Sequence, residues 1–64
     1  GGYINFSMKI FNHWGERIFD EENLFWNGKV NMELAQSGAY TYTIIAFDFL
    51  NKQYVFTGSF LLIQ

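Results

Sequence analysis

The stretch FNHWGERIF, residues 11–19, brings together the side chains of this chain that are best suited to chemistry. His13 is the single histidine, and Glu16 follows it three residues later. An imidazole can act as a general base near neutral pH. Nucleophilic catalysis also needs a Ser, Thr or Cys beside the base and an acid that orients it. His13 lies instead in a turn-forming sequence beside Trp14, so we expect a turn residue rather than a general base.

The other acidic residues do not form a catalytic or metal-binding pattern. Residues 20–23, Asp-Glu-Glu-Asn, predict a solvated loop, because they lack the D-x-[DN]-x-[DN]-G order of a calcium loop. Glycoside hydrolysis needs two carboxylates facing each other across a cleft, whereas these cluster in one loop. Asp48 lies in an apolar context. It could pair with Lys52 or Arg17, or it could face solvent near the end of the strand, and we favour the second alternative. One histidine and no cysteine argue against a zinc site and exclude a disulfide, and we expect no cofactor.

Charge and hydropathy exclude further classes. The formal net charge is −2, with four Lys and Arg against six Asp and Glu, so the chain lacks the basic stripe that nucleic-acid binding needs. No apolar run approaches the roughly 18 residues of a membrane-spanning helix. The sequence therefore predicts no nucleic-acid partner and no direct membrane span.

Aromatic residues make up 22% of the chain. Each can bury about 150–250 Å², which is a large core for so short a sequence. Alternatively, Trp14, Trp26, Tyr40, Tyr42 and Tyr54 could form a stacking platform for a glycan. We favour the core, because a small domain has little else to bury.

The pattern of the first half of the chain is that of β-strands. Residues 4–10 alternate between apolar and polar types, which marks a half-buried strand. Residues 12–15, Asn-His-Trp-Gly, have turn chemistry, and an extended run resumes at Glu16, so residues 8–19 predict a hairpin with a four-residue connection. Residues 24–26 form a short apolar run that Asn27-Gly28, a strong turn dipeptide, brings to an end.

The second half contains two longer strands. Residues 31–36 have a locally helical composition and predict a single helical turn or an irregular crossover. Residues 39–49 predict a central strand covered on both faces, because both faces become apolar toward its end. A turn at Asn51-Lys52 leads to a returning strand over residues 54–63, in which Gly58 indicates a bulge or a close approach. The terminal run 60–63 either offers an edge to a partner or is the last core strand.

Short strands joined by short turns, with no convincing helix, predict an all-β fold, namely a small Ig-like antiparallel β-sandwich. We expect residues 1–64 to be a single domain, and a fragment of a longer chain. The sandwich is short of strands, so we expect one or two further strands before Gly1.

Four motifs occur in an order that resembles a known family. KIFNHWGERIF (9–19), WNG (26–28), SGAYTYTI (37–44) and GSFLLIQ (58–64) are similar to the successive motifs of the gliding-motility-associated C-terminal domain. The resemblance covers about residues 8–64. The chain departs from the family pattern in having His13 in place of an Arg, Asn27 in place of an Asp and Gln64 in place of a basic residue. It also lacks the proline before Ser37-Gly38.

The resemblance implies a non-catalytic type B sorting domain of the type IX secretion system. Such a domain is a folded C-terminal tag that directs a large surface adhesin or secreted cargo through the periplasm to the cell surface. The partners implied are components of the type IX translocon and an outer-membrane β-barrel protein. The alternative is a glycan- or surface-binding adhesin module.

These considerations nominate two sets of residues. The predicted partner-binding residues are Asn12, His13, Trp14, Glu16, Trp26, Asn27, Phe60, Leu62 and Gln64. The residues predicted to shape turns, strands and core are Gly15, Gly28, Gly38, Tyr40, Tyr42 and Gly58.

Overall fold

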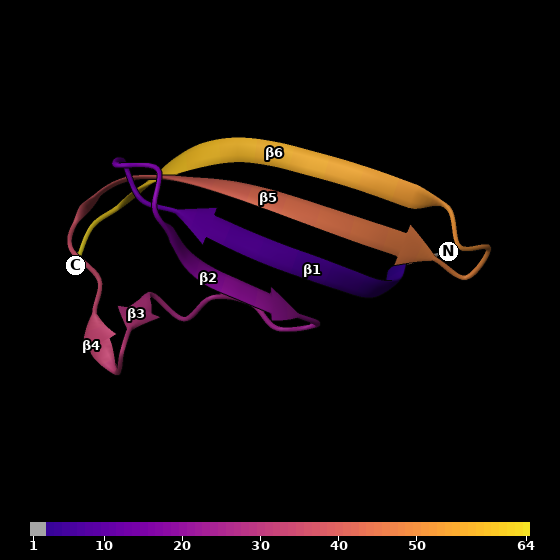
Figure 1. Cartoon of the computed structure of the whole chain (residues 1–64), viewed down its shortest axis with the longest axis horizontal. Coiled ribbons are helices and arrows are strands. Elements are labelled where there is room, and N and C mark those ends of the chain that lie inside the picture. The colour runs from indigo at the N-terminus through magenta and orange to yellow at the C-terminus, as the bar shows by residue number, and fades with distance from the viewer. Residues whose placement is uncertain (1–2) are drawn as a thin grey trace.

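A computed structural model describes residues 3–64, and this part of the chain forms antiparallel strands without a helix (Figure 1). The strands are β1 (Tyr3–Phe11), β2 (Arg17–Glu22), β3 (Lys29–Val30), β4 (Glu33–Leu34), β5 (Gly38–Asp48) and β6 (Gln53–Leu62). A four-stranded sheet has the order β2-β1-β5-β6, and β3 pairs with β4. The predicted all-β antiparallel fold is therefore confirmed. The strands expected before Gly1 lie outside the described residues. Within residues 3–64, no helix is long and apolar enough to cross a membrane.

The register places most apolar side chains of the sheet on one face. Ile10 lies opposite Tyr42 and Phe19, and Met8 lies opposite Ile44. Because directly opposite residues share a face, the alternation seen in the sequence becomes a continuous apolar surface across the sheet. We call this surface the inner face.

The crossover segment, residues 23–37, covers one end of the inner face. It contains β3 and β4, which lie at the end of the sheet where the C-terminus also lies (Figure 1). Ala35 from this segment is buried with Ile10 and Tyr40 of the sheet, and Trp26 and Val30 pack against them. The arrangement is consistent with a small Ig-like β-sandwich whose second layer, within the described residues, is this segment.

β5 occupies the central position that its sequence predicts, but residues 3–64 do not cover it on both sides. Its inner face includes buried Tyr40 and Ala46. On its outer face Thr41 is exposed, and Ile45 and Phe47 are half-buried, and none of the described strands packs over them. The apolar residues at this end of β5 are shielded by neighbours within the sheet, which sequence alternation cannot distinguish from a second layer.

Two local predictions are wrong. Residues 20–22 belong to β2 rather than to a loop, with Asp20 opposite Lys9, because cross-strand pairing overrides the low strand propensity of acidic residues. Residues 31–34 form the turn and the second strand of a hairpin rather than a helical turn or an irregular stretch. Asn31 and Met32 have φ values of 52° and 69°, which makes them the two-residue turn of the β3–β4 hairpin.

The β1–β2 and β5–β6 hairpins turn with the same geometry at opposite ends of the sheet. In the first, the Asn12 Oδ1 accepts hydrogen bonds from the N–H groups of Trp14 (3.0 Å) and Glu16 (2.9 Å). In the second, the Asp48 Oδ1 accepts from the N–H groups of Leu50 and Lys52, both at 2.9 Å. A side-chain oxygen at the first turn position thus satisfies the backbone donors that the turn leaves over.

The fourth residue of each of these turns has positive φ. It is Gly15 in the first turn, at 82°, and Asn51 in the second, at 62°. Glycine and asparagine adopt this conformation most readily, as the sequence indicates. Glu16 completes the first turn, so the connection is one residue longer than predicted.

Gly58 marks a close approach rather than a bulge. The β5–β6 register runs without a break through the pair Tyr42 and Gly58. A Cβ atom at Gly58 would lie 2.6 Å from the hydroxyl oxygen of Tyr42 and 2.7 Å from its Cζ. The missing side chain therefore leaves room for the Tyr42 ring on the neighbouring strand.

The Asp48 turn generates a prediction about acid stability. Hydrogen bonds, first of all from the Lys52 N–H, hold the pKa of Asp48 below its ordinary value. Because the folded pKa is depressed, the contribution is complete at neutral pH. It is lost as the pH falls below about 4, the usual pKa of an unfolded aspartate, and through the folded pKa. We expect Asp48→Asn to keep the turn, as Asn12 does, and to flatten the dependence of stability on pH in this range.

Urea unfolding of the two proteins between neutral pH and pH 2 measures this difference. Asp20→Asn is the matched control, because Asp20 is an exposed strand carboxylate that takes no part in a turn. If the free energy of unfolding of Asp48→Asn depends on pH as that of the wild type does, the Asp48 carboxylate is not the source of the acid sensitivity.

Candidate functional site

An apolar groove of about 640 Å³ opens on the inner face, where the crossover segment leaves the sheet uncovered. Strands β1, β5 and β6 form its floor and the start of the crossover segment forms its wall. Its lining residues are Met8, Ile10, Phe25, Trp26, Asn27, Gly28, Tyr42, Ile44, Phe56, Phe60, Leu62 and Gln64. Apart from the amides of Asn27 and Gln64, these side chains are apolar or aromatic, so the groove suits the burial of an apolar partner.

The wall of the groove is shaped by the Trp26-Asn27-Gly28 turn. The Trp26 Nε1–H donates to the carbonyl of Lys29 at 3.0 Å, and the Lys29 N–H donates to the Asn27 Oδ1 at 3.0 Å. Asn27 therefore acts through a side-chain carbonyl oxygen, which an aspartate also possesses. The structure explains why asparagine serves at the position where the related pattern has aspartate.

Gln64 fastens the crossover segment to the sheet. Its Nε2 donates to the carbonyl oxygens of Ala35 (2.7 Å) and Gly28 (3.2 Å). A Cβ atom at Gly28 would lie 3.1 Å from the Gln64 Oε1, so glycine provides the space for this side chain. Ser37 adds a second link, because its Oγ accepts from the Gln64 N–H at 2.9 Å and donates to the Gln64 carbonyl at 3.1 Å.

Three aromatic rings join the crossover segment to β5 and β6. Trp26 and Tyr40 have ring centroids 5.3 Å apart, and Tyr40 stacks on Phe60 at 5.7 Å. The Tyr40 hydroxyl donates to the carbonyl of Gln36 at 2.6 Å. Trp26 and Tyr40 are thus parts of the core, as is Tyr42, which packs against the same cluster, and they do not form an open stacking platform.

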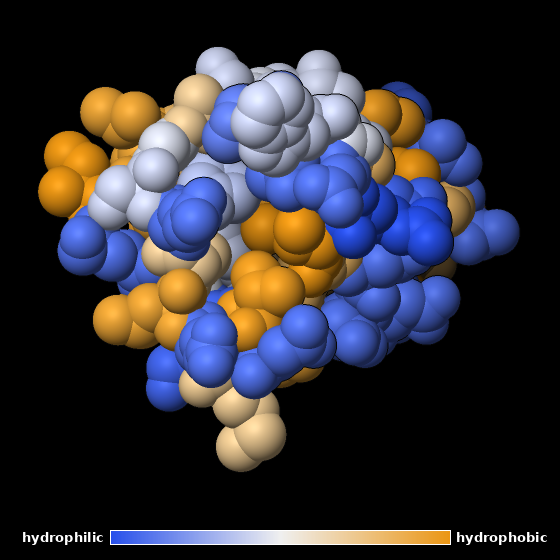
Figure 2. Space-filling view, turned by 60° about the vertical axis from the view of Figure 1, so that its left-hand side comes forward, coloured by the Kyte–Doolittle hydropathy of each residue, from blue (hydrophilic) through white to orange (hydrophobic). Residues whose placement is uncertain are grey.

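A second, smaller hollow of about 290 Å³ lies between the β1–β2 turn and the β3–β4 hairpin. Asn12, His13 and Trp14 line one side of it and Glu33 the other. Figure 2, which brings this end of the molecule forward, shows hydrophobic side chains at the centre of a mostly hydrophilic surface.

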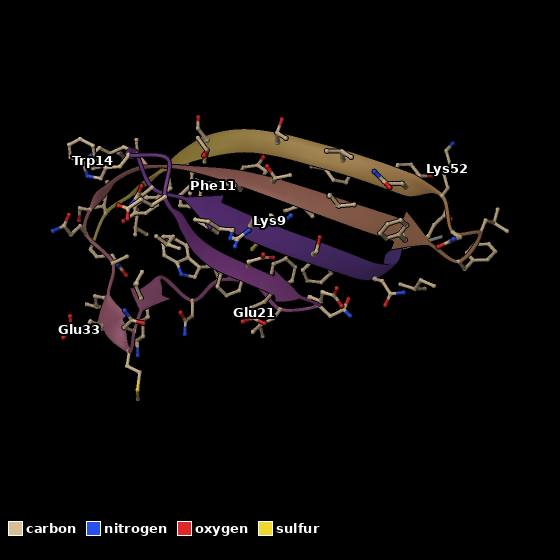
Figure 3. The ribbon with its side chains drawn as sticks, viewed as in Figure 1. Lys9, Phe11, Trp14, Glu21, Glu33 and Lys52 are labelled. Atoms are coloured by element: carbon tan, nitrogen blue, oxygen red, sulfur yellow. The ribbon has the colours of Figure 1, made fainter. Side chains whose placement is uncertain are left out.

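Trp14 is a large exposed side chain at this end. It is 76% exposed and extends away from the sheet, at the end opposite Lys52 (Figure 3). The His13 ring lies beside it, with 4.6 Å between centroids. The tip of the turn therefore presents two exposed rings.

The described residues offer surfaces for binding. Within residues 3–64, no three His, Asp or Glu side chains gather as a metal site would require. The Asp48 carboxylate, which the sequence favoured as solvent-facing, caps a turn and accepts a hydrogen bond from the Tyr54 hydroxyl at 3.1 Å. Arg17 forms an exposed ion pair with Asp20 at 3.5 Å, an interaction of little energetic weight.

The predicted partner-binding residues fall into two groups. Trp26, Asn27, Phe60, Leu62 and Gln64 line the apolar groove, and Asn12, His13 and Trp14 line the second hollow. Glu16 lies in the β1–β2 turn, where its Oε1 accepts from the Asn12 Nδ2 at 3.2 Å.

Sequence reasoning missed five lining residues of the groove, Met8, Ile10, Phe25, Ile44 and Phe56. The signal for four of them was present. Met8, Ile10, Ile44 and Phe56 hold the apolar alternation phase of their strands, and the register places them on one face. Phe25 had no such signal, because its position depends on the path of the crossover segment.

A small antiparallel β-domain with an apolar groove and an exposed aromatic turn defines a binding domain. Comparison with known families specifies which kind. The chain matches the CHU_C type IX secretion signal domain over residues 1–62 and belongs to that family. It is accordingly a type IX secretion C-terminal sorting signal, from a family that is non-catalytic in general, and it directs export toward the cell surface. No curated protein and no solved structure matches the chain.

The Gln64 contacts generate a prediction about the crossover segment. Gln64→Glu keeps the shape of the side chain but replaces the donor by an oxygen that faces the Ala35 carbonyl. We expect a loss of about 1–2 kcal/mol in the free energy of unfolding and faster hydrogen exchange of the Ala35 N–H, which bonds to the Gly28 carbonyl.

Urea unfolding and amide exchange measure the two effects. Glu16→Gln is the matched control, because it makes a carboxylate–amide exchange at a turn remote from Gln64. If the Ala35 amide in Gln64→Glu exchanges as slowly as in the wild type, the Gln64 hydrogen bonds do not hold the crossover segment in place.

Proposed function

We propose that this domain ends a longer chain, a large surface adhesin or other secreted cargo, and docks on the type IX translocon and an outer-membrane β-barrel partner. In this proposal the cargo passes through the periplasm and is delivered to the outside of the outer membrane. The apolar groove is the single observation that carries the docking surface. Family membership supports the export role, and the groove supplies the place where a partner binds.

The groove has the composition of a protein interface. Its aromatic floor and wall provide anchor residues, and the amides of Asn27 and Gln64 supply polar groups at one side. Phe25, which is 68% exposed and stacks on Phe6 at 4.8 Å, lies at its margin and is open to a partner. The exposed rings of His13 and Trp14 form a second contact region in this proposal.

The second candidate function is a glycan- or surface-binding adhesin module. Trp14 favours it, because an exposed indole can stack on a sugar ring. Trp26, Tyr40 and Tyr42 do not add to it, since they are engaged in the core. Sorting is the better supported function.

A fusion experiment tests the docking surface. The chain is attached to a fluorescent protein in a type IX-competent cell that also expresses a partner barrel, and surface fluorescence is measured. We expect Phe25→Asp to reduce surface delivery about tenfold, because it places a charge in the apolar groove. Leu50→Asp is the control, since Leu50 is exposed to a similar degree in the turn at the far end of the sheet.

Two outcomes would oppose the proposal. If the wild-type fusion stays in the periplasm, the sorting function fails. If Phe25→Asp is exported as well as the wild type while circular dichroism shows it folded, the groove is not the docking surface. Binding on a glycan array that Trp14→Ala abolishes, with export unaffected, would favour the adhesin function.

His13→Arg restores the residue that the related pattern has at this position. His13 is exposed and its ring lies beside that of Trp14, so we expect the melting temperature to change little. We expect surface delivery of the same fusion to rise, because the turn belongs to the proposed contact region. Delivery equal to that of the wild type would remove His13 from the docking surface.

A further inference from the structure

The two edges of the four-stranded sheet differ sharply in charge. β2 forms one edge, and four of its residues are charged: Arg17, Asp20, Glu21 and Glu22. β6 forms the other edge, spans ten residues and carries no charge and no proline. Exposed edges are usually protected by charge, proline or a bulge, and β6 has none of these within Gln53–Leu62.

The outward backbone groups of β6 follow from its register. The Asp48 N–H donates to the Lys52 carbonyl at 3.1 Å, so this pair is a hydrogen-bonded pair of the antiparallel ladder. Such pairs alternate with non-hydrogen-bonded ones, which directs the even-numbered residues of β6 toward β5. The N–H and C=O groups of Val55, Thr57, Ser59 and Leu61 therefore point away from β5. Their side chains are exposed, Val55 by 56% and Leu61 by 69%.

We propose that β6 pairs with β6 of a second copy of this chain, antiparallel and with Gly58 on the two-fold axis. In this register Thr57 of one copy lies opposite Ser59 of the other, and Val55 lies opposite Leu61. Each pair occurs twice and matches hydroxyl with hydroxyl and apolar with apolar, the combinations that stabilise cross-strand neighbours. The two four-stranded sheets join into one.

The sequence of β6 selects this register over its neighbours. Moving the second copy by one hydrogen-bonded step places Val55 opposite Ser59 in one direction. In the other direction it places Thr57 opposite Leu61. Each alternative keeps one central hydroxyl pair, Thr57 with Thr57 or Ser59 with Ser59, but twice places an apolar residue of β6 opposite a hydroxyl. Only the register centred on Gly58 pairs the outward residues Val55, Thr57, Ser59 and Leu61 of β6 all like with like.

Charge argues for a second copy as the occupant and for closure at two copies. A β6 strand meets no like charge on another β6 strand, because neither has any. Further growth through β2 is disfavoured, because Asp20, Glu21 and Glu22 put three acidic residues on that edge and charge protects an edge strand from pairing. The described residues also bury few large side chains, with Ile10, Ala35, Tyr40 and Ala46 as the buried hydrophobic ones, and small domains commonly gain stability by association.

Sedimentation velocity of the intact chain tests the proposal. We expect the mass to rise from that of a 7.5 kDa monomer to twice that value between micromolar and millimolar concentration. Val55→Glu and Leu61→Lys, each alone, raise the dissociation constant of the dimer about tenfold, because each places two charges opposite apolar side chains. An equimolar mixture of the two variants forms a heterodimer, in which the Glu at 55 faces the Lys at 61.

The mixture of the two variants tests the register. It also shows that each variant is folded, because a misfolded chain would not form the heterodimer. Leu50→Lys is the control, since it adds a charge at an exposed apolar position outside β6, and it dimerises like the wild type. A folded chain that stays monomeric at millimolar concentration overturns the proposal, as does failure of the two variants to form a heterodimer. Pairing of β6 with a different protein's strand in place of a second copy would also overturn it. Dimerisation is measured without export, so its failure leaves the proposed docking function untouched.

Discussion

The attachment of the crossover segment to the inner face is the constraint on which the rest of the structure depends. Among the described residues, this segment alone lies over the apolar face of the sheet, and it reaches only one end of it. The segment is attached by the Trp26–Tyr40–Phe60 ring cluster and by the hydrogen bonds of Gln64 to Gly28 and Ala35. The groove exists because the segment stops short, so the same contacts that close the core also define the wall of the proposed docking surface.

The β1–β2 and β5–β6 turns share one backbone geometry but carry different outward side chains. Asn12 and Asp48 each use an Oδ1 to satisfy two N–H groups, and the turns place their second and third residues outward. At one end these residues are His13 and Trp14, and at the other they are Phe49 and Leu50, all of them exposed. Because both turns have the same geometry, a partner can distinguish them only by the two outward side chains.

Sequence reasoning predicted the long strands well, because alternation, turn dipeptides and uninterrupted β-branched and aromatic runs act locally. It failed at residues 20–22, where pairing with Lys9 and its neighbours decides the strand, and at residues 31–36, where two positive φ values convert a helical composition into a hairpin. It found Trp26 and Gln64 through motif order, but not that Gln64 would reach Gly28 and Ala35 far along the chain. Contacts of this kind depend on the path of the crossover segment, which no local pattern encodes.

A sorting signal that is recognised in its folded state must present a surface rather than a linear peptide. The inner face supplies such a surface, because an apolar sheet that is only partly covered trades some stability for a site that another protein can bury. The uncharged β6 edge lies beside the same groove, and Phe60 and Leu62 contribute to both. Pairing of two β6 strands would bring two grooves to either side of one axis, so that a partner with two docking sites would bind the pair more tightly than a single domain.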